Sequence, residues 1–138
     1  NFVVDEVVAK DKFMRDLYKN AGSRTGQKTI VVTPEKAKFY WDEYAFKEYN
    51  CILIAKTISV IYDLVTHGVP MKELNIGGIA QKDPEKDLLV TKSVYLNKAD
   101  AARLKEMNEH YGVENIYFQA TPSAPKSSLK EVLKQFGL

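Results

Sequence analysis

The stretches that decide the fold are CILIAKT at 51–57, HGVPMKELNIGGI at 67–79 and TKSVYL at 91–96. CILIA is a short continuous apolar run, which is typical of a strand buried on both faces of a parallel sheet. Thr57 is placed to cap a helix that stops at Gly68, and Pro70 follows shortly after that stop. Residues 73–76 then read as another short strand. The succession predicts strands that alternate with helices.

The rest of the chain continues this alternation. Further strands are expected at 2–4, 28–33, 88–90, 92–96 and 113–118. Further helices are expected at 9–21, from Thr33 through the aromatic residues up to Phe46, at 98–110 and at 127–136. This order predicts an α/β protein with an open, mostly parallel, doubly wound sheet and helices on both faces. At 138 residues the chain is expected to form a single domain, 1–138.

Composition excludes several classes of function. Twenty Lys and Arg residues against 18 Asp and Glu residues give a net charge of +2, so we expect no nucleic-acid partner. No apolar run approaches the length of a transmembrane helix. The single cysteine, Cys51, precludes an internal disulfide framework and is interpreted as a small buried hydrophobic residue.

Five residues at the carboxyl ends of predicted strands are the candidates for chemistry, because ligands of such sheets bind there. Asp5 is placed to orient a cationic group, to bind a metal, or simply to begin a helix. Lys56 and Thr57 combine a cation, a hydroxyl and helix amides, which suits an anion, although capping by Thr57 alone explains its presence equally well. Gly77 and Gly78 would let the backbone approach a ligand closely, but a Gly-Gly pair alone is a weak signal.

Other sites of catalysis and cofactor binding have little support. His67 and His110 each fall near the carboxyl end of a predicted helix, where capping explains a histidine. Neither histidine nor the lone cysteine belongs to a group with metal-ligand spacing, so no metal is expected. The sequence contains neither GxGxxG nor GxxxxGK[ST], and we expect no cofactor.

Taken in order, five motifs resemble the IIB subunit of the mannose/fructose/sorbose family of bacterial phosphotransferase (PTS) sugar-uptake systems. These motifs are VVDEVVAKD at 3–11, CILIAKT at 51–57, HGVPMKELNIGG at 67–78, TKSVYLNKAD at 91–100 and FQATP at 118–122. The resemblance runs along essentially the whole chain.

The resemblance implies a phosphoryl-carrier subunit of a phosphoenolpyruvate-dependent system, acting as a protein-phosphohistidine sugar phosphotransferase. Phosphate would arrive from a IIA protein and leave for a sugar bound by the membrane subunits IIC and IID. The protein would be cytoplasmic and peripheral to the inner face of the membrane. A mannose-, sorbose- or N-acetylgalactosamine-type sugar fits equally, and homo-oligomerisation is left open.

One element of the family pattern has no counterpart in these residues. The family's reactive histidine lies in a loop after the first strand, in a motif resembling D-x-R-L-I-H-G-Q, and neither His67 nor His110 matches it. We therefore expect the acceptor upstream of Asn1, in a segment that the N-terminally truncated chain lacks, and no catalytic residue within 1–138. Asp5 would then orient the acceptor loop. Lys56, Thr57, Gly77 and Gly78 would shape the phosphate pocket.

Two other classes of protein share the expected architecture. A receiver- or flavodoxin-like signalling or binding module would place Asp5 and Lys56 in an acidic pocket, but no aspartate ends CILIA. A dinucleotide-binding domain would require the glycine fingerprint that the chain lacks.

Overall fold

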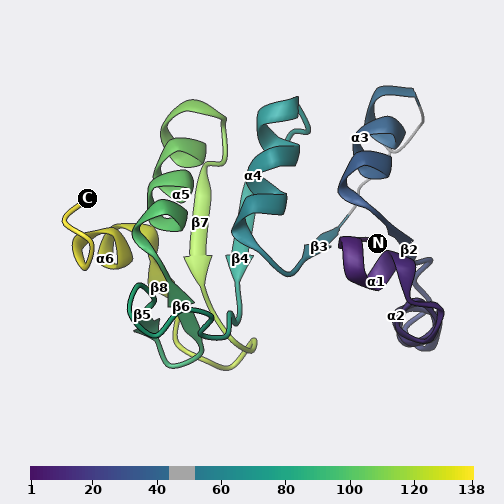
Figure 1. Cartoon of the computed structure of the whole chain (residues 1–138), viewed down its shortest axis with the longest axis horizontal. Helices are drawn as coiled ribbons and strands as arrows, with labels where there is room; N and C mark the ends of the chain where they lie inside the picture. Colours follow the sequence, from purple (N-terminus) through teal and green to yellow (C-terminus); the bar gives the residue numbers. More distant parts are fainter. Residues whose placement is uncertain (44–51) are drawn as a thin grey trace. The chain divides into compact units, whose positions relative to one another are not determined.

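Figure 1 shows the computed structural model of the chain, in which residues 1–43 and 52–138 are described. The chain divides into two compact units, Asn1–Val69 and Pro70–Leu138. The elements of the first unit are β1 (Phe2–Val4), α1 (Glu6–Lys10), α2 (Lys12–Arg24), β2 (Ile30–Val32), α3 (Pro34–Glu43), β3 (Leu53–Ala55) and α4 (Ile58–His67). The second unit contains β4 (Glu73–Ile76), β5 (Leu88–Thr91), β6 (Val94–Leu96), α5 (Lys98–His110), β7 (Asn115–Phe118), β8 (Ser127–Ser128) and α6 (Leu129–Lys134).

In the first unit, β1 lies between two parallel neighbours in the order β2-β1-β3. The connection from β1 to β2 and the connection from β2 to β3 therefore run in opposite directions across the sheet. Because such crossovers are right-handed, they place α1 and α2 on one face and α3 on the other. α4 packs against α3 and shares its face. The predicted α/β class with a doubly wound, mostly parallel sheet is confirmed.

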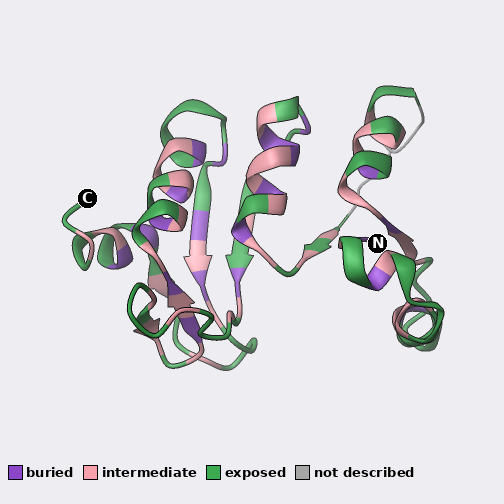
Figure 2. Cartoon of the chain, viewed as in Figure 1, coloured by how far each residue is buried: buried purple, intermediate pink, exposed green. Residues whose placement is uncertain are grey.

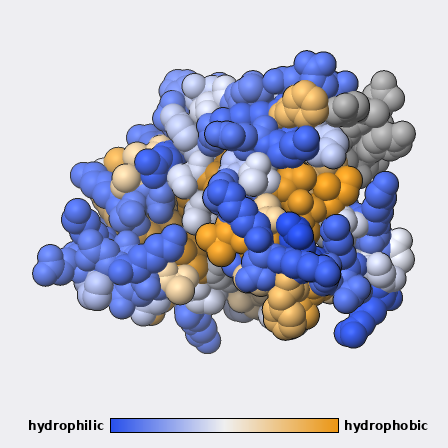
Figure 3. All heavy atoms as spheres, turned by 45° about the vertical axis from the view of Figure 1, so that its right-hand side comes forward, coloured by the Kyte–Doolittle hydropathy of each residue, from blue (hydrophilic) through white to orange (hydrophobic). Residues whose placement is uncertain are grey.

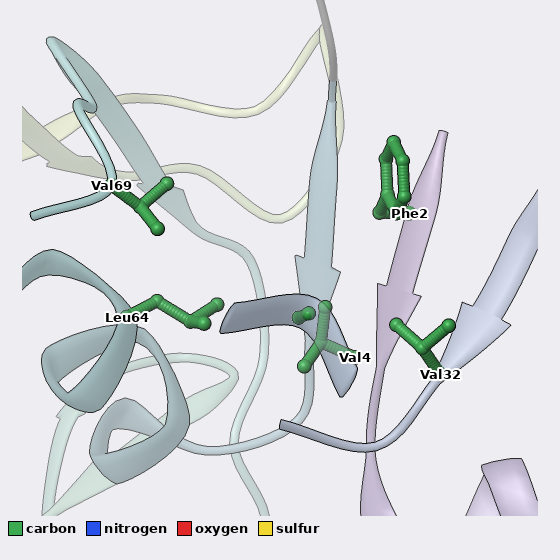
Figure 4. Packing of buried hydrophobic residues seen from close by; sticks show 6 residues of the cluster. Phe2, Val4, Val32, Leu64 and Val69 are labelled. Atoms are coloured by element: carbon green, nitrogen blue, oxygen red, sulfur yellow. The ribbon is translucent and has the colours of Figure 1, made fainter. Parts of the chain in front are cut away.

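The core of the first unit lies between this sheet and the α3–α4 face. Its buried members are Phe2, Val4, Val32, Ala37, Leu64 and Val69. Phe2 and Val4 are two residues apart, so their side chains leave β1 on the same side and meet the helices together (Figure 4). All three residues of β1 are buried, and Phe2 and Val4 belong to this core.

The second unit is organised around β7. Its order is β4-β7-β8, with β4 parallel and β8 antiparallel to β7, and β5 and β6 form a separate antiparallel pair. α5 and α6 contact β7. Buried residues follow one side of α5 at Ala101, Leu104 and Met107 (Figure 2). No helix in the described part of the chain has the length and apolar character needed to cross a membrane.

Several predicted boundaries are confirmed and two helix predictions are corrected. α4 begins after its cap Thr57 and ends at Gly68, which has the left-handed φ of 111° that favours glycine. The helix predicted at 9–21 is instead two helices that divide at Asp11, because the Asp11 carboxylate accepts a hydrogen bond from the Met14 amide and starts a new helix.

The helix predicted at 127–136 is the second correction. Its first two residues pair with β7 as β8, and the helix follows as α6 with Ser128 as its cap. Of the apolar run CILIA, Leu53–Ala55 is strand β3. Cys51 and the aromatic residue Phe46 lie outside the described residues.

Gly22 is required by a close contact between α2 and the segment that leads to β2. A Cβ atom at this position would clash with Oγ1 of Thr29 and lie 3.0 Å from the carbonyl oxygen of Gln27. We expect Gly22→Ala to lower the free energy of unfolding by about 1–3 kcal/mol, although alanine favours helices. Urea denaturation monitored by circular dichroism measures this change.

Ser23→Ala is the matched control for the Gly22 variant, because Ser23 is exposed in the same turn of α2. It should change stability by less than about 0.5 kcal/mol. Adding Thr29→Ala to Gly22→Ala should restore part of the loss. A Gly22→Ala protein as stable as the unsubstituted chain would contradict the packing described for α2.

Candidate functional site

The carboxyl edge of sheet β2-β1-β3 is the candidate site of the first unit. Val4 pairs in register with Ala55, so the residues that follow them, Asp5 and Lys56, leave the sheet at neighbouring positions. The connections of this sheet diverge between β1 and β3, which makes this edge a topological switch point. Ligands of doubly wound sheets bind outside the strand ends at such points.

Three helices begin at this edge, and each has a side-chain cap. Oδ1 of Asp5 accepts a hydrogen bond of 2.9 Å from the Val8 amide at the start of α1. Oγ1 of Thr57 accepts one of 3.3 Å from the Val60 amide in α4. Oγ1 of Thr33 accepts one of 3.2 Å from the Lys36 amide in α3. The helix-start interpretation of Asp5 and Thr57 is therefore correct as their structural role.

The caps leave several amides of α3 and α4 directed toward the same edge, where the helix dipoles provide partial positive charge. Lys56 adds a full positive charge, is exposed, and has no salt bridge within the described residues. Asp5 supplies one carboxylate beside it, with Oδ1 already engaged in the cap. The edge is chemically suited to hold a phosphoryl group and to orient a neighbouring cationic or imidazole group.

Gly77 and Gly78 belong to the second unit, at the carboxyl end of β4. Neither has positive φ. A Cβ atom on Gly77 would lie 3.4 Å from the carbonyl oxygen of Gln119, and one on Gly78 would lie 3.6 Å from that of Ser93. Both spacings are ordinary van der Waals contacts, so the backbone geometry does not demand glycine. Their role in a phosphate pocket stays a prediction.

The structure thus brings three of the five predicted residues to one edge in the first unit, Asp5, Lys56 and Thr57. The other two are neighbours in the second unit. Within each unit the placement agrees with the rule that the carboxyl ends of parallel strands share an edge.

Sequence reasoning missed a side-chain clamp in the second unit. Asn75 donates through Nδ2 to the carbonyl oxygen of Gln119 and accepts through Oδ1 from the Gln119 amide, at 3.2 and 3.1 Å. Oγ of Ser93 also donates to the carbonyl oxygen of Gly77 at 2.8 Å. An asparagine inside a predicted strand was the available signal, because asparagine is rare in strands.

Neither histidine lies at the carboxyl end of a strand. His67 is the last residue of α4 and His110 is the last residue of α5. Nε2 of His67 lies 3.0 and 3.1 Å from the two carboxylate oxygens of Asp42, so His67 connects the last turn of α4 to α3. His110 ends α5, with Nε2 3.8 Å from Oε2 of Glu109. No cluster of three or more His, Cys, Asp or Glu residues suited to a metal occurs within residues 1–43 and 52–138.

Comparison with known proteins gives consistent results along the chain. The family model described as "PTS system sorbose subfamily IIB component" matches residues 2–137. A PTS system sorbose-specific EIIB component from Lacticaseibacillus casei is 27% identical over 107 residues, which are 78% of this chain. The chain spans 63% of the length of that curated relative.

Solved structures agree with this assignment. The crystal structure of manxB from Thermoanaerobacter tengcongensis is 29% identical, with a TM-score of 0.85 over 98% of this chain and 79% of that chain. The IIBSor domain of the sorbose permease from Klebsiella pneumoniae, at 24% identity, shares the fold with a TM-score of 0.83 over 97% of this chain and 79% of that chain. The chain belongs to the family of sorbose-subfamily IIB components of the PTS system.

Proposed function

We propose that this protein is a phosphoryl carrier of a phosphoenolpyruvate-dependent sugar phosphotransferase system. The observation that carries the proposal is the match of residues 2–137 to the sorbose-subfamily IIB component. In this role the protein receives phosphate from a IIA protein and passes it to a sugar held by the membrane subunits IIC and IID. It works in the cytoplasm at the inner face of the membrane. The carboxyl edge of β1 and β3 is where the phosphoryl group is held.

The chemistry assigned to this edge is positioning and charge neutralisation. During transfer, the bond from phosphorus to the donor breaks while a bond from phosphorus to the acceptor forms, and negative charge spreads over the three equatorial oxygens. Lys56 and the first amides of α4 offer positive charge to those oxygens. Asp5 orients the acceptor loop. The acceptor histidine itself is expected outside these 138 residues, and that expectation stays a prediction.

A receiver-like function has less support than the carrier function. β3 ends at Ala55 and continues with Lys56, so the position after this strand offers an ammonium group where an acidic acceptor would be required.

Binding of the phosphate donor, IIA, to this chain tests the role of Lys56. A sorbose-type IIA protein is phosphorylated through phosphoenolpyruvate and the general carrier proteins, and its binding to this chain is measured by isothermal titration calorimetry. Lys56→Ala should weaken binding of the phosphorylated protein about three- to tenfold, because one charged hydrogen bond is lost. Binding of unphosphorylated IIA should change less than twofold, roughly the limit set by surface substitutions.

Lys130→Ala is the control for this titration, since Lys130 is an exposed lysine on α6 of the second unit. It should leave both affinities unchanged. Absence of any complex between this chain and IIA would count against the carrier function. An equal loss for both forms of IIA with Lys56→Ala would reject only the role of Lys56 at the phosphoryl group.

The two histidines permit a separate test by intact mass spectrometry. When the 138-residue chain is incubated with phosphoenolpyruvate, the general carriers and IIA, we expect no acid-labile phosphoryl group on it, because His67 faces Asp42 and His110 ends α5. If a phosphoryl group were found, His67→Gln and His110→Gln would identify its position. That result would refute the assignment of the acceptor while leaving the carrier function in place.

A further inference from the structure

The segment 77–79, which follows β4, is held against β6 by hydrogen bonds within the second unit. The Ile79 amide donates to the carbonyl oxygen of Ser93, and the Tyr95 amide donates to that of Ile79, both at 2.9 Å. Oγ of Ser93 donates to the carbonyl oxygen of Gly77 at 2.8 Å. The two bonds of Ile79 join backbone groups, whereas the bond to Gly77 is made by a side chain. The orientation of the Gly77 carbonyl therefore depends on the Ser93 hydroxyl.

The other side of this segment lies against the end of β7. A Cβ atom on Gly77 would be 3.4 Å from the carbonyl oxygen of Gln119. The Asn75 side chain bonds both the amide and the carbonyl group of Gln119, which fixes that part of the backbone. The segment 77–79 is thus packed between two fixed neighbours, residues 93–95 and Gln119. Backbone groups held in this way need little reorganisation when they bind a ligand.

The Ser93 hydrogen bond determines how the peptide group between Gly77 and Gly78 is oriented. Glycine imposes few steric limits on the backbone, so a Gly-Gly peptide group is free to rotate unless another group holds it. In a trans peptide the C=O and N–H groups point in opposite directions. Because the Gly77 carbonyl is directed at Ser93, the Gly78 N–H is directed away from Ser93. Loss of the hydroxyl would release this orientation.

The Gly78 amide is suited to an anion. Gly78 is exposed, and its N–H has no acceptor in the part of the chain that the structure describes. A hydrogen bond accepted by the carbonyl group polarises the peptide and strengthens the N–H on its other side as a donor. Hydrophobic side chains gather at the surface in the view of Figure 3, and they offer no such donor. Backbone N–H groups bind an oxyanion through charge-assisted hydrogen bonds.

We propose that Ser93 is a positioning residue for phosphoryl binding, which holds the peptide group between Gly77 and Gly78 so that the Gly78 amide donates to an oxygen of the phosphoryl group. Ser93 does not touch the phosphoryl group itself, because its Oγ donates to Gly77. This role rests on the proposed function and on the predicted place of Gly77 and Gly78 in the phosphate pocket. It adds the donating atom and the side chain that orients it.

Isothermal titration calorimetry with phosphorylated and unphosphorylated IIA tests this role in the 138-residue chain. The measured quantity is the preference, which is the ratio of the affinity for phosphorylated IIA to the affinity for unphosphorylated IIA. Ser93→Ala should lower the preference about two- to fivefold, because the donor is no longer held in place and a charge-assisted hydrogen bond is weakened. Ser93→Thr retains the hydroxyl and should restore the preference.

Thr25→Ala is the matched control for Ser93→Ala. Oγ1 of Thr25 donates to the carbonyl oxygen of Gly22 at 2.9 Å, so this variant removes the same kind of hydrogen bond at the end of α2, away from the carboxyl ends of the strands. It should leave the preference unchanged. Circular dichroism verifies that each variant is folded.

The Gly78 amide provides a second readout, which a merely structural role of Ser93 would not change. In NMR spectra of the isotope-labelled chain, the Gly78 amide signal should shift between the complexes with phosphorylated and with unphosphorylated IIA. Ser93→Ala should reduce that shift. In the free chain, the Gly78 amide should exchange with solvent faster than the Ile79 amide, which donates to Ser93.

The outcomes separate the role of Ser93 from the carrier function. An unchanged preference in Ser93→Ala would overturn the role of Ser93 and leave the carrier function in place. A Gly78 amide that does not respond to the phosphoryl group, or that exchanges as slowly as the Ile79 amide, would do the same. An unsubstituted chain that binds neither form of IIA would remove the carrier function and this role together.

Discussion

The parallel pairing of β1 with β2 on one side and β3 on the other is the constraint on which the first unit depends. Because β1 is the first strand in the chain and the middle strand of the sheet, the connection from β1 to β2 and the connection from β2 to β3 run in opposite directions. The register determines where the strands end. Val4 pairs with both Val32 and Ala55, so the three strands end at the same edge of the sheet. A core built on Phe2 and Val4 and an edge at which three helices begin both follow from this arrangement.

That arrangement places the proposed chemical roles at the residues that also have structural roles. Asp5 and Thr57 cap helices, which fixes their backbones at the strand ends. Each cap uses one side-chain oxygen and leaves other helix amides directed to the edge. Lys56 stands between the end of β3 and the cap of α4, where its charge adds to that of the helix. The proposed role as a phosphoryl carrier would require such neutralising groups rather than acid–base chemistry.

The sequence allowed the fold class to be predicted because local signals agreed with each other. The bounds of α4 could be read from Thr57 and Gly68, and β4 from residues 73–76. The division at Asp11 could not be read, because an aspartate on the polar side of a helical pattern looks the same whether it caps or continues the helix. β8 was missed because it consists of two serines whose pairing depends on β7 being beside them. The adjacency of Asp5 and Lys56 followed from a general rule on strand ends, whereas the Asn75–Gln119 clamp required the β4–β7 register.

We propose that the phosphoryl group is held at the carboxyl edge of β1 and β3. Amide NMR spectra of the isotope-labelled chain, recorded with phosphorylated and with unphosphorylated IIA, test this claim most directly. The differences between the two spectra report the phosphoryl group itself. We expect the largest differences at Asp5–Val8, Thr33 and Lys56–Ser59. Differences centred on His67, on His110 or on the amino ends of the strands would contradict it.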